Sequence, residues 1–348
     1  MSNDDNGSTD ASARVVELTN RGDLDELTRY VDERADAGAW DQLVEARDLC
    51  RAALARGRQL WPVTAYIAYR LALDAPGPVA AAAVDDADGP GAAAAKFGFG
   101  PLGEVAASTH EWSEIGAHLV RGPTRAVVAH ERVVRGEDLT DAGVDASVLD
   151  IPLVLAPWEP AYALAVYKVT KAEFPAPGLP PPAAWETVPL GFDPPAAATD
   201  EQDQEAARCL TEVASAWAAE SNGRVEAVAV EGDATGALRS FGLRRARMVE
   251  VDAASALAWL AWAGASGGAH GRRRGAATGR FAAWWAAAGL TGGLDHWPLS
   301  ADDLGDALAE LRWFLWDDGA PATGWSLRLA AEDPSAGVAW AVAAVDAD

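Results

Sequence analysis

The chain has 348 residues, of which 50% are hydrophobic and 23% are charged. These proportions are close to the averages of globular domains, so they exclude a chain that is disordered, collagen-like or coiled coil as a whole. The formal net charge is −24, and so acidic a surface repels phosphate backbones and anionic membranes. We therefore expect a folded acidic protein that binds neither nucleic acids in general nor membranes.

The N-terminus, the apolar stretches and the cysteines indicate the cellular location of the protein. Residues 1–10 are polar and acidic, whereas a signal peptide needs a basic stretch followed by an apolar one. The most apolar stretches, 253–263 and 281–290, are well short of the roughly 20 residues that span a bilayer. Cys50 and Cys209 lie on apolar stripes at helical spacing, which predicts two buried thiols. The sequence thus predicts a cytoplasmic protein without a disulfide framework.

Residues 11–172 predict a mainly helical domain that follows a disordered leader at 1–10. Apolar residues recur at helical spacing in 24–31 and again in 40–50, which predicts a helical hairpin. Pro62 stands at the first turn of a third helix, and Pro123 opens a further one. The Gly- and Asp-rich residues 85–103 predict a loop. Helical pairs in sequence suggest an irregular, solenoid-like arrangement.

A proline-rich segment follows the helical part. Eight of the 20 prolines of the chain fall between residues 173 and 198. Proline lacks an amide hydrogen and has a fixed φ, so this run cannot form a helix or a central strand. We predict a linker at 173–200 between the two domains.

Residues 201–348 predict an α+β domain with a small sheet. Short Val-containing runs at 224–230 and 247–251 predict strands, and helices are predicted at 205–219, 235–241 and 253–263. Ser300 and Asp303 form a capping box, and the leucines at 304, 308, 311 and 315 predict one helix that ends at Gly319. Alternation in 325–329, a turn at 333–337 and the apolar run 338–345 predict a closing β-hairpin.

One segment reverses the charge of the chain. Residues 253–294 contain no acidic residue, yet a Gly-rich stretch within 264–285 carries four arginines and leads into a helix. Arginine binds carboxylate or phosphate in bidentate fashion, and glycine lets backbone amides approach an anion. The segment therefore predicts an anion or ligand site. Its candidate residues are His270, Arg272, Arg273, Arg274, Arg280 and Trp284.

A purely structural interpretation of the same segment remains open. Glycine and alanine at spacings of three and four also permit close helix packing, and buried arginines are often paired with carboxylates. Asp317, Asp318 and Glu310 are the candidate partners, because the predicted helix would place both aspartates at its C-terminal end, where the helix dipole disfavours negative charge.

The remaining motifs are weaker. His110, His118 and His130 have no metal-binding spacing such as HExxH, so the sequence predicts no metal site and no cofactor. The chain contains 15 tryptophans, which either fill volume between small core residues or line an aromatic pocket or interface.

Several stretches of the chain resemble an uncharacterised protein family of high-GC actinobacteria. The resemblance is carried by RQLWP (58–62), VAHERVVRG (128–136), SGGAHGRRRG (266–275), LRWFLWDDG (311–319) and PATGWSLRLAAED (321–333). The family is a domain of unknown function, so the resemblance implies no activity and no catalytic residue. It implies that both parts of the chain belong to one type of protein.

These observations lead to two functional hypotheses. The first is a non-enzymatic cytoplasmic protein that binds an unknown protein partner or a small anionic ligand through residues 264–285. The alternative is an enzyme that acts on a phosphorylated or carboxylated small molecule, with the arginines holding the anion and His270 as general acid or base.

Overall fold

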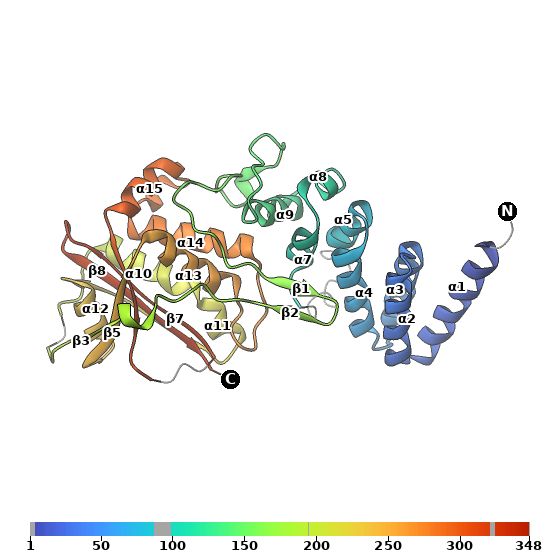
Figure 1. The fold of residues 1–348 in the computed structure, drawn as a ribbon, viewed down its shortest axis with the longest axis horizontal. Coiled ribbons are helices and arrows are strands. Elements are labelled where there is room, and N and C mark those ends of the chain that lie inside the picture. Colours follow the sequence, from blue (N-terminus) through green and yellow to red (C-terminus); the bar gives the residue numbers. More distant parts are fainter. Residues whose placement is uncertain (1–3, 87–98, 194, 321–323, 348) are drawn as a thin grey trace. The chain divides into compact units, whose positions relative to one another are not determined.

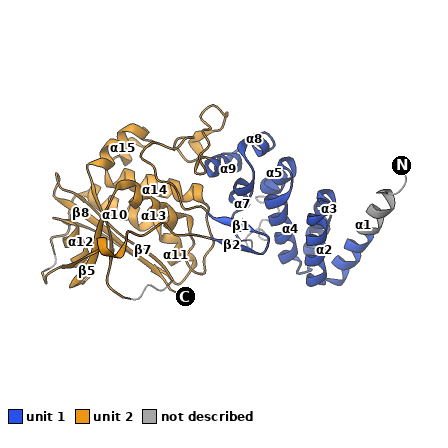
Figure 2. Ribbon diagram, in the orientation of Figure 1, with its two compact units in different colours: residues 1–132, 165–173 blue, residues 133–164, 174–348 orange. Residues whose placement is uncertain are grey.

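The computed structural model describes residues 4–86, 99–193, 195–320 and 324–347. The chain divides into two compact units, which Figure 2 shows in different colours. Unit 1 contains residues 1–132 and 165–173, and unit 2 contains residues 133–164 and 174–348. Together they form an α+β fold, as predicted, because the sheet of unit 2 is antiparallel and its helices are not interleaved with parallel strands.

Unit 1 is built from successive helices and one small hairpin (Figure 1). Leu27, Leu43, Cys50 and Ile67 meet in its core, which confirms the predicted helical hairpin and one predicted buried thiol. Its elements are α1 (Asp4–Arg21), α2 (Leu24–Asp36), α3 (Trp40–Ala55), α4 (Trp61–Asp74), α5 (Gly77–Asp85), α7 (Leu102–Thr109), α8 (Trp112–Ile115), α9 (Pro123–Val133), β1 (Val166–Lys168) and β2 (Lys171–Glu173).

The helix starts of unit 1 follow from its prolines. Pro62 lies in the first turn of α4 and Pro123 opens α9, where the missing amide hydrogen has no intrahelical partner to lose. Within the predicted loop at 85–103, residues 87–98 lie outside the described part of the chain. The hairpin of β1 and β2 was not anticipated from the sequence, because each strand has three residues and these are too few to show a period.

Unit 2 contains a six-stranded antiparallel sheet in the order β3-β5-β6-β7-β8-β4. The strands are β3 (Glu186–Pro189), β4 (Arg224–Glu231), β5 (Arg245–Val251), β6 (Arg312–Asp317), β7 (Trp325–Asp333) and β8 (Val338–Asp346). The helices are α10 (Glu201–Val213), α11 (Ser215–Glu220), α12 (Ala234–Ser240), α13 (Ala253–Ala265), α14 (Ala276–Leu290) and α15 (Ala301–Ala309). The predicted closing hairpin is confirmed as β7 and β8.

The two faces of this sheet belong to different cores. Along β8, Trp340 and Val342 pack with α10, α13, α14 and α15, whereas Ala339 and Ala341 pack with α12. Alternate residues of a strand point to opposite faces, so this division follows from the period of two. Figure 1 shows α10, α13 and α14 grouped beside β7 and β8. The sheet is thus covered by helices on both faces, which explains why residues 313–316 of the central strand β6 are all buried and apolar.

The predicted helix from Ser300 to Gly319 is wrong in its second half. The cap is as expected, because Ser300 Oγ accepts a hydrogen bond from the Asp303 amide at 3.1 Å, but α15 ends at Ala309. Leu311 and Leu315 belong to the turn and to β6, whose residues 313–316 are all buried. A strand that is buried on both faces does not alternate between apolar and polar residues. The spacing of the leucines was therefore also compatible with a helix that continues through Leu311 and Leu315.

The predicted domain limits also need correction. Residues 4–10 of the expected leader lie in α1, and residues 133–164 of the expected helical domain belong to unit 2. The expected linker at 173–200 belongs almost entirely to unit 2, where 186–189 form β3 at the edge of the sheet. Proline is tolerated at such an edge, and Pro189 occupies the last position of the strand.

Two glycines set the close approach of α13 and α14. A Cβ atom added to Gly279 would lie 2.1 Å from the carbonyl oxygen of Ala261, and one added to Gly264 would lie 2.6 Å from Cβ of Ala282. Both distances are shorter than real Cβ contacts, so the helices can pack at this separation because these positions lack side chains. This observation favours the structural interpretation of the small residues in 264–285.

We expect Gly279→Ala to lower the free energy of unfolding by about 1–3 kcal/mol, the usual cost of overpacking. The change also improves helix propensity by up to about 1 kcal/mol, but α13 must move to accommodate the methyl group. Gly178→Ala is the control, because nothing lies within 4 Å of its added Cβ, and should shift stability by less than about 0.5 kcal/mol. Urea unfolding of both variants measures the difference, and equal stabilities would contradict this account of the helix contact.

Candidate functional site

Arg280 is buried and fully occupied by partners inside the protein. Its side chain is 0% exposed, and Nε and Nη2 donate to the two carboxylate oxygens of Glu159, each at 2.7 Å. Nη1 donates to the carbonyl of Pro152 at 2.7 Å, and Nη2 also donates to that of Val154 at 3.0 Å. The guanidinium therefore holds segment 150–160 against α14, and it is not available to an external anion.

The carboxylate of Glu159 is stabilised in its ionised form by these contacts. Burial raises its pKa, but the hydrogen bonds and the charge of Arg280, with hydrogen bonds from Tyr162 and from the Ala156 amide, outweigh burial, so its pKa lies below the ordinary value. The pair is an internal ion pair of the kind that the structural interpretation of the segment anticipated, with Glu159 in place of the partners named there.

Trp284 is likewise part of the core. It is 1% exposed, its ring centroid lies 4.9 Å from that of Trp158, and the Arg280 guanidinium lies 5.7 Å from its ring centroid. The predicted grouping of Arg280 with Trp284 on one helix face is therefore confirmed as geometry. Because both side chains are buried, this face serves packing and presents no site to solvent.

The other predicted residues lie in the loop between α13 and α14. His270, Arg272 and Arg274 are exposed, and the Arg273 guanidinium lies 4.9 Å from the ring centroid of Phe174. Backbone contacts fix this loop, since the amide of His270 donates to Ser221 and that of Ala269 to the buried carboxylate of Asp346. The structure does not bring these four side chains together with Arg280 and Trp284, because α14 begins only at Ala276.

Two of the three carboxylates proposed as partners of these arginines have other partners, and no ion pair joins the third, Glu310, to them among the described residues. Asp317 forms an ion pair with Arg247 at 3.2 Å, and Asp318 forms one with Arg328 at 2.6 Å. The expectation failed because it placed both aspartates at the end of a helix, whereas they lie at the end of β6, next to β5 and β7.

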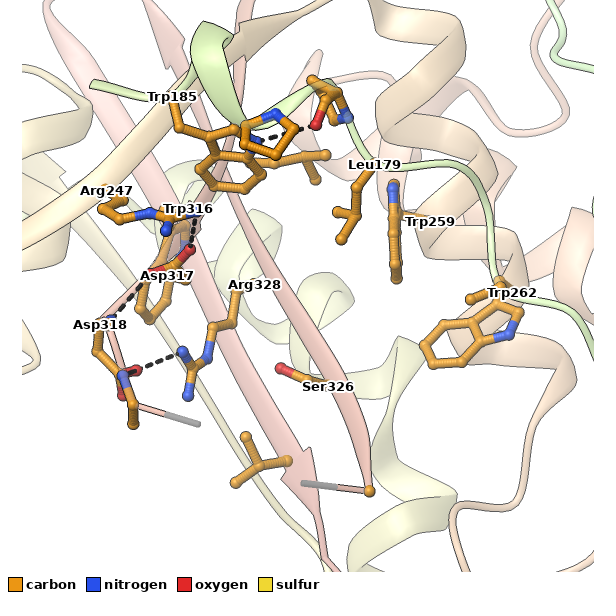
Figure 3. Close-up of a pocket in the computed structure, with 18 of the residues that line it drawn as sticks. Leu179, Trp185, Arg247, Trp259, Trp262, Trp316, Asp317, Asp318, Ser326 and Arg328 are labelled. Atoms are coloured by element: carbon orange, nitrogen blue, oxygen red, sulfur yellow. Dashed lines mark hydrogen bonds and ion pairs between the residues drawn. The ribbon is translucent and has the colours of Figure 1, made fainter. Parts of the chain in front are cut away.

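A cavity of about 870 Å³ lies at this same end of the sheet in unit 2 (Figure 3). Its walls are largely aromatic and aliphatic, and its charged residues come from neighbouring strands. The apolar lining includes Leu179, Trp185, Trp259, Trp262, Leu315, Trp316 and Val345, with three prolines at 180–182. The polar lining includes Arg224, Arg247, Asp317, Asp318, Ser326 and Arg328.

The cavity forms where two central strands separate. The pairing of β6 with β7 runs from Arg312 opposite Glu332 to Leu315 opposite Leu329. Beyond that point β6 continues beside β5 to Asp317, while β7 has run beside β8 from Trp325. The lining residues Trp316, Asp317, Ser326 and Arg328 all lie on these diverging ends, so the divergence of the strands opens the space.

The proline-rich segment supplies another wall. The indole nitrogen of Trp185 donates to the carbonyl of Pro180 at 3.2 Å, which closes 180–185 into a compact loop. The Arg247 guanidinium lies 5.3 Å from the Trp185 ring centroid and so ties this loop to β5. Figure 3 shows Trp185 and Leu179 along the rim and the rings of Trp259 and Trp262 beyond Leu179. The expected linker thus helps to build a cavity.

Two of the three arginines in the cavity are neutralised by aspartates. The pKa of Asp318 is lowered, because hydrogen bonds from the Ala320 amide and Arg328 outweigh the rise that burial causes. Arg224 differs from Arg247 and Arg328, because it has no carboxylate partner within the described part of the chain. Its side chain is also exposed. Counted over the described residues, the cavity lining therefore carries one positive charge without a counterion, in a protein with a net charge of −24.

Sequence reasoning missed the cavity residues because they come from seven separate segments. No local signal marked them, since the strands that carry Arg224, Arg247 and Arg328 contain other charged residues as well. Among the described residues, no cluster of three His, Cys, Asp or Glu side chains fits a metal ion. Over the same residues, no helix combines the length and apolarity needed to cross a bilayer.

Comparison with known proteins agrees with the family resemblance. We found no match among curated proteins and none among solved structures. A family model, described as a family of unknown function (DUF6183), matches residues 25–348 and so covers both units. The chain therefore belongs to this family of unknown function.

Proposed function

We propose that this protein binds a small organic ligand in the cavity at the diverging ends of β6 and β7. The observation that carries the proposal is the cavity itself, with a volume of about 870 Å³, four tryptophan residues in its lining and a few charged groups. Ligand sites are typically concave, mostly apolar, about 300–1,000 Å³ in volume, and equipped with few polar groups that orient the ligand.

The proposal moves the ligand site away from residues 264–285. Arg280 and Trp284 are buried in the core, so they cannot meet a ligand without unfolding of their surroundings. Of the two kinds of partner that the sequence leaves open, a cavity of this size favours a small molecule over a protein. A cytoplasmic location and an actinobacterial source are kept as predictions that follow from the sequence.

Binding of an uncharged aromatic probe tests the proposal. We expect 2-naphthamide to change the tryptophan fluorescence of the full-length protein in a saturable manner, because Trp185, Trp259, Trp262 and Trp316 line the cavity. Leu179→Asp should weaken binding by roughly tenfold, since a charge replaces an apolar wall group. Leu179 is 64% exposed, so the variant should remain folded.

Val120→Asp is the matched control, because Val120 is 67% exposed and lies in unit 1. It makes the same type of change without touching the cavity, and we expect it to leave binding unaltered. No saturable binding of the probe, or equal losses in both variants, would refute the proposed function.

A further inference from the structure

We infer that the cavity selects a flat apolar molecule bearing a single carboxylate, and that Arg224 is the residue that recognises this carboxylate. The inference rests on the proposed function and adds the chemical class of the ligand. It follows from the balance of charges in the cavity, from the register of three strands and from the way the aromatic walls are held.

The charge balance leaves one binding group for an anion. The cavity is lined by three arginines and two aspartates, and the pairs Arg247–Asp317 and Arg328–Asp318 account for four of the five. Arg224 is the remaining one and has no carboxylate partner among the described residues. A guanidinium presents two parallel N–H donors that match the two oxygens of a carboxylate.

Strand register places Arg224 in the part of the cavity lining that lies on the α12 face of the sheet. Arg224 of β4 lies opposite Val345 of β8, and Val345 lies opposite Ser326 of β7, so the three residues form one row on one face of the sheet. Neighbouring strands are about 4.8 Å apart, which puts the backbones of Arg224 and Ser326 about 10 Å from each other. An arginine side chain spans most of that distance, so its guanidinium can reach an anion that lies over Val345 and beside the Ser326 hydroxyl.

The aromatic walls favour a flat ring system. Trp262 stacks on Trp325 with ring centroids 4.9 Å apart and an interplanar angle of 19°, and Trp316 stacks on Phe241 with centroids 5.7 Å apart and an angle of 21°. Trp217 meets the Trp262 ring edge-on at 5.8 Å. Trp262 belongs to the core on the α13 face of the sheet, whereas Trp316 lies on the α12 face, as the row of Arg224, Val345 and Ser326 does. The stacking contacts fix both rings before any ligand arrives, and rigid flat rings bind a rigid flat ligand with little loss of entropy.

The charge balance also restricts the charge of the ligand. Asp317 and Asp318 already occupy Arg247 and Arg328, so Arg224 can neutralise one negative charge of a ligand and a second would have no counterion in the described lining. A carboxylate carries one charge at neutral pH, whereas a phosphate monoester carries about −1.5 to −2. The cavity therefore favours a monocarboxylate over a phosphate ester.

The test compares three probes that share one ring system. Titration calorimetry of the full-length protein, at about 0.15 M salt to screen its net charge, should show 2-naphthoate binding at least tenfold more tightly than 2-naphthamide. It should also bind more tightly than 2-naphthyl phosphate. Arg224→Gln should reduce the affinity for 2-naphthoate to that of the amide and leave binding of 2-naphthamide unchanged.

Arg245→Gln is the matched control. Arg245 is also an exposed strand arginine without a carboxylate partner in the described residues, but it does not line the cavity. Its replacement removes the same charge and should leave all three affinities unchanged. Equal affinities for naphthoate and naphthamide, equal effects of both variants, or a preference for the phosphate would overturn the inference while the proposed function stands. If no probe binds, the proposed function fails as well.

Discussion

Replacing Glu159 by alanine is expected to lower the free energy of unfolding by about 3–5 kcal/mol, because it leaves the buried Arg280 guanidinium without its carboxylate. Both side chains are 0% exposed, so water cannot replace the lost partner. The variant also removes the acceptor of the Ala156 amide. Urea unfolding followed by tryptophan fluorescence measures the change, since tryptophans pack around this pair.

Glu250→Ala is the control for this prediction. Glu250 pairs with Arg312, and their side chains are 55% and 49% exposed, so its loss should cost less than about 1 kcal/mol. A loss of that size for Glu159→Ala would instead mean that the buried pair contributes no more than a surface pair.

The Glu159–Arg280 pair should also make the free energy of unfolding depend on pH. The pKa of Glu159 is lower in the folded state than its ordinary value, so its contribution is fully present above the unfolded pKa and is lost as the pH falls through the folded pKa. The difference in unfolding free energy between the parent protein and Glu159→Ala should stay constant from about pH 7 to pH 5 and shrink below about pH 4. A difference that grows on acidification would contradict the assignment of an ionised Glu159.

Trp217→Ala is expected to lower the free energy of unfolding by about 3–5 kcal/mol, the range for removing a large buried ring. Trp217 is 0% exposed, and its ring contacts those of Trp262 and Trp325 edge-on, with centroids 5.8 and 6.4 Å away. Because Trp262 lines the cavity, the variant should also weaken binding of 2-naphthamide. The two effects are measured by urea unfolding and by fluorescence titration below the unfolding transition.

Phe192→Ala serves as the comparison. Phe192 is 79% exposed, so its truncation removes an aromatic ring without opening a cavity and should cost less than about 1 kcal/mol. If Trp217→Ala lowered the free energy of unfolding by no more than Phe192→Ala, the specific ring contacts of Trp217 would not contribute to stability. If Trp217→Ala were destabilised but bound the probe as tightly as the parent protein, Trp217 would stabilise the core without positioning Trp262 in the cavity.

Local patterns in the sequence were enough to predict most individual elements. The stripes around Leu27 and Leu43, the start of α4 at Pro62, the Ser300 cap and the closing hairpin are all decided within a few residues of chain. Propensity, capping and periodicity act over that range. The same rules failed at β6, because a strand buried on both faces has no period that distinguishes it from a helix.

The candidate site shows where local patterns stop being informative. The cluster at 272–274 was noticed because its arginines are adjacent in sequence, yet the arginines of the cavity are 23 and 81 residues apart along the chain from one to the next. Strand order and register place all three in the lining of one cavity, and register is fixed by long-range pairing and by which face of each strand is buried. A single sequence contains no direct signal for that pairing.

An acidic α+β protein with a helical first part, a closing hairpin and buried cysteines could be predicted from the sequence, because charge, composition and short-range periodicity act without reference to the rest of the chain. Only the tertiary structure shows that Arg280 pairs with Glu159, that the proline-rich segment lines a cavity, and that Arg224 lines it too without a carboxylate partner among the described residues. Each of these depends on which distant segments meet, and the balance of burial, charge pairing and strand register over the whole unit selects those contacts.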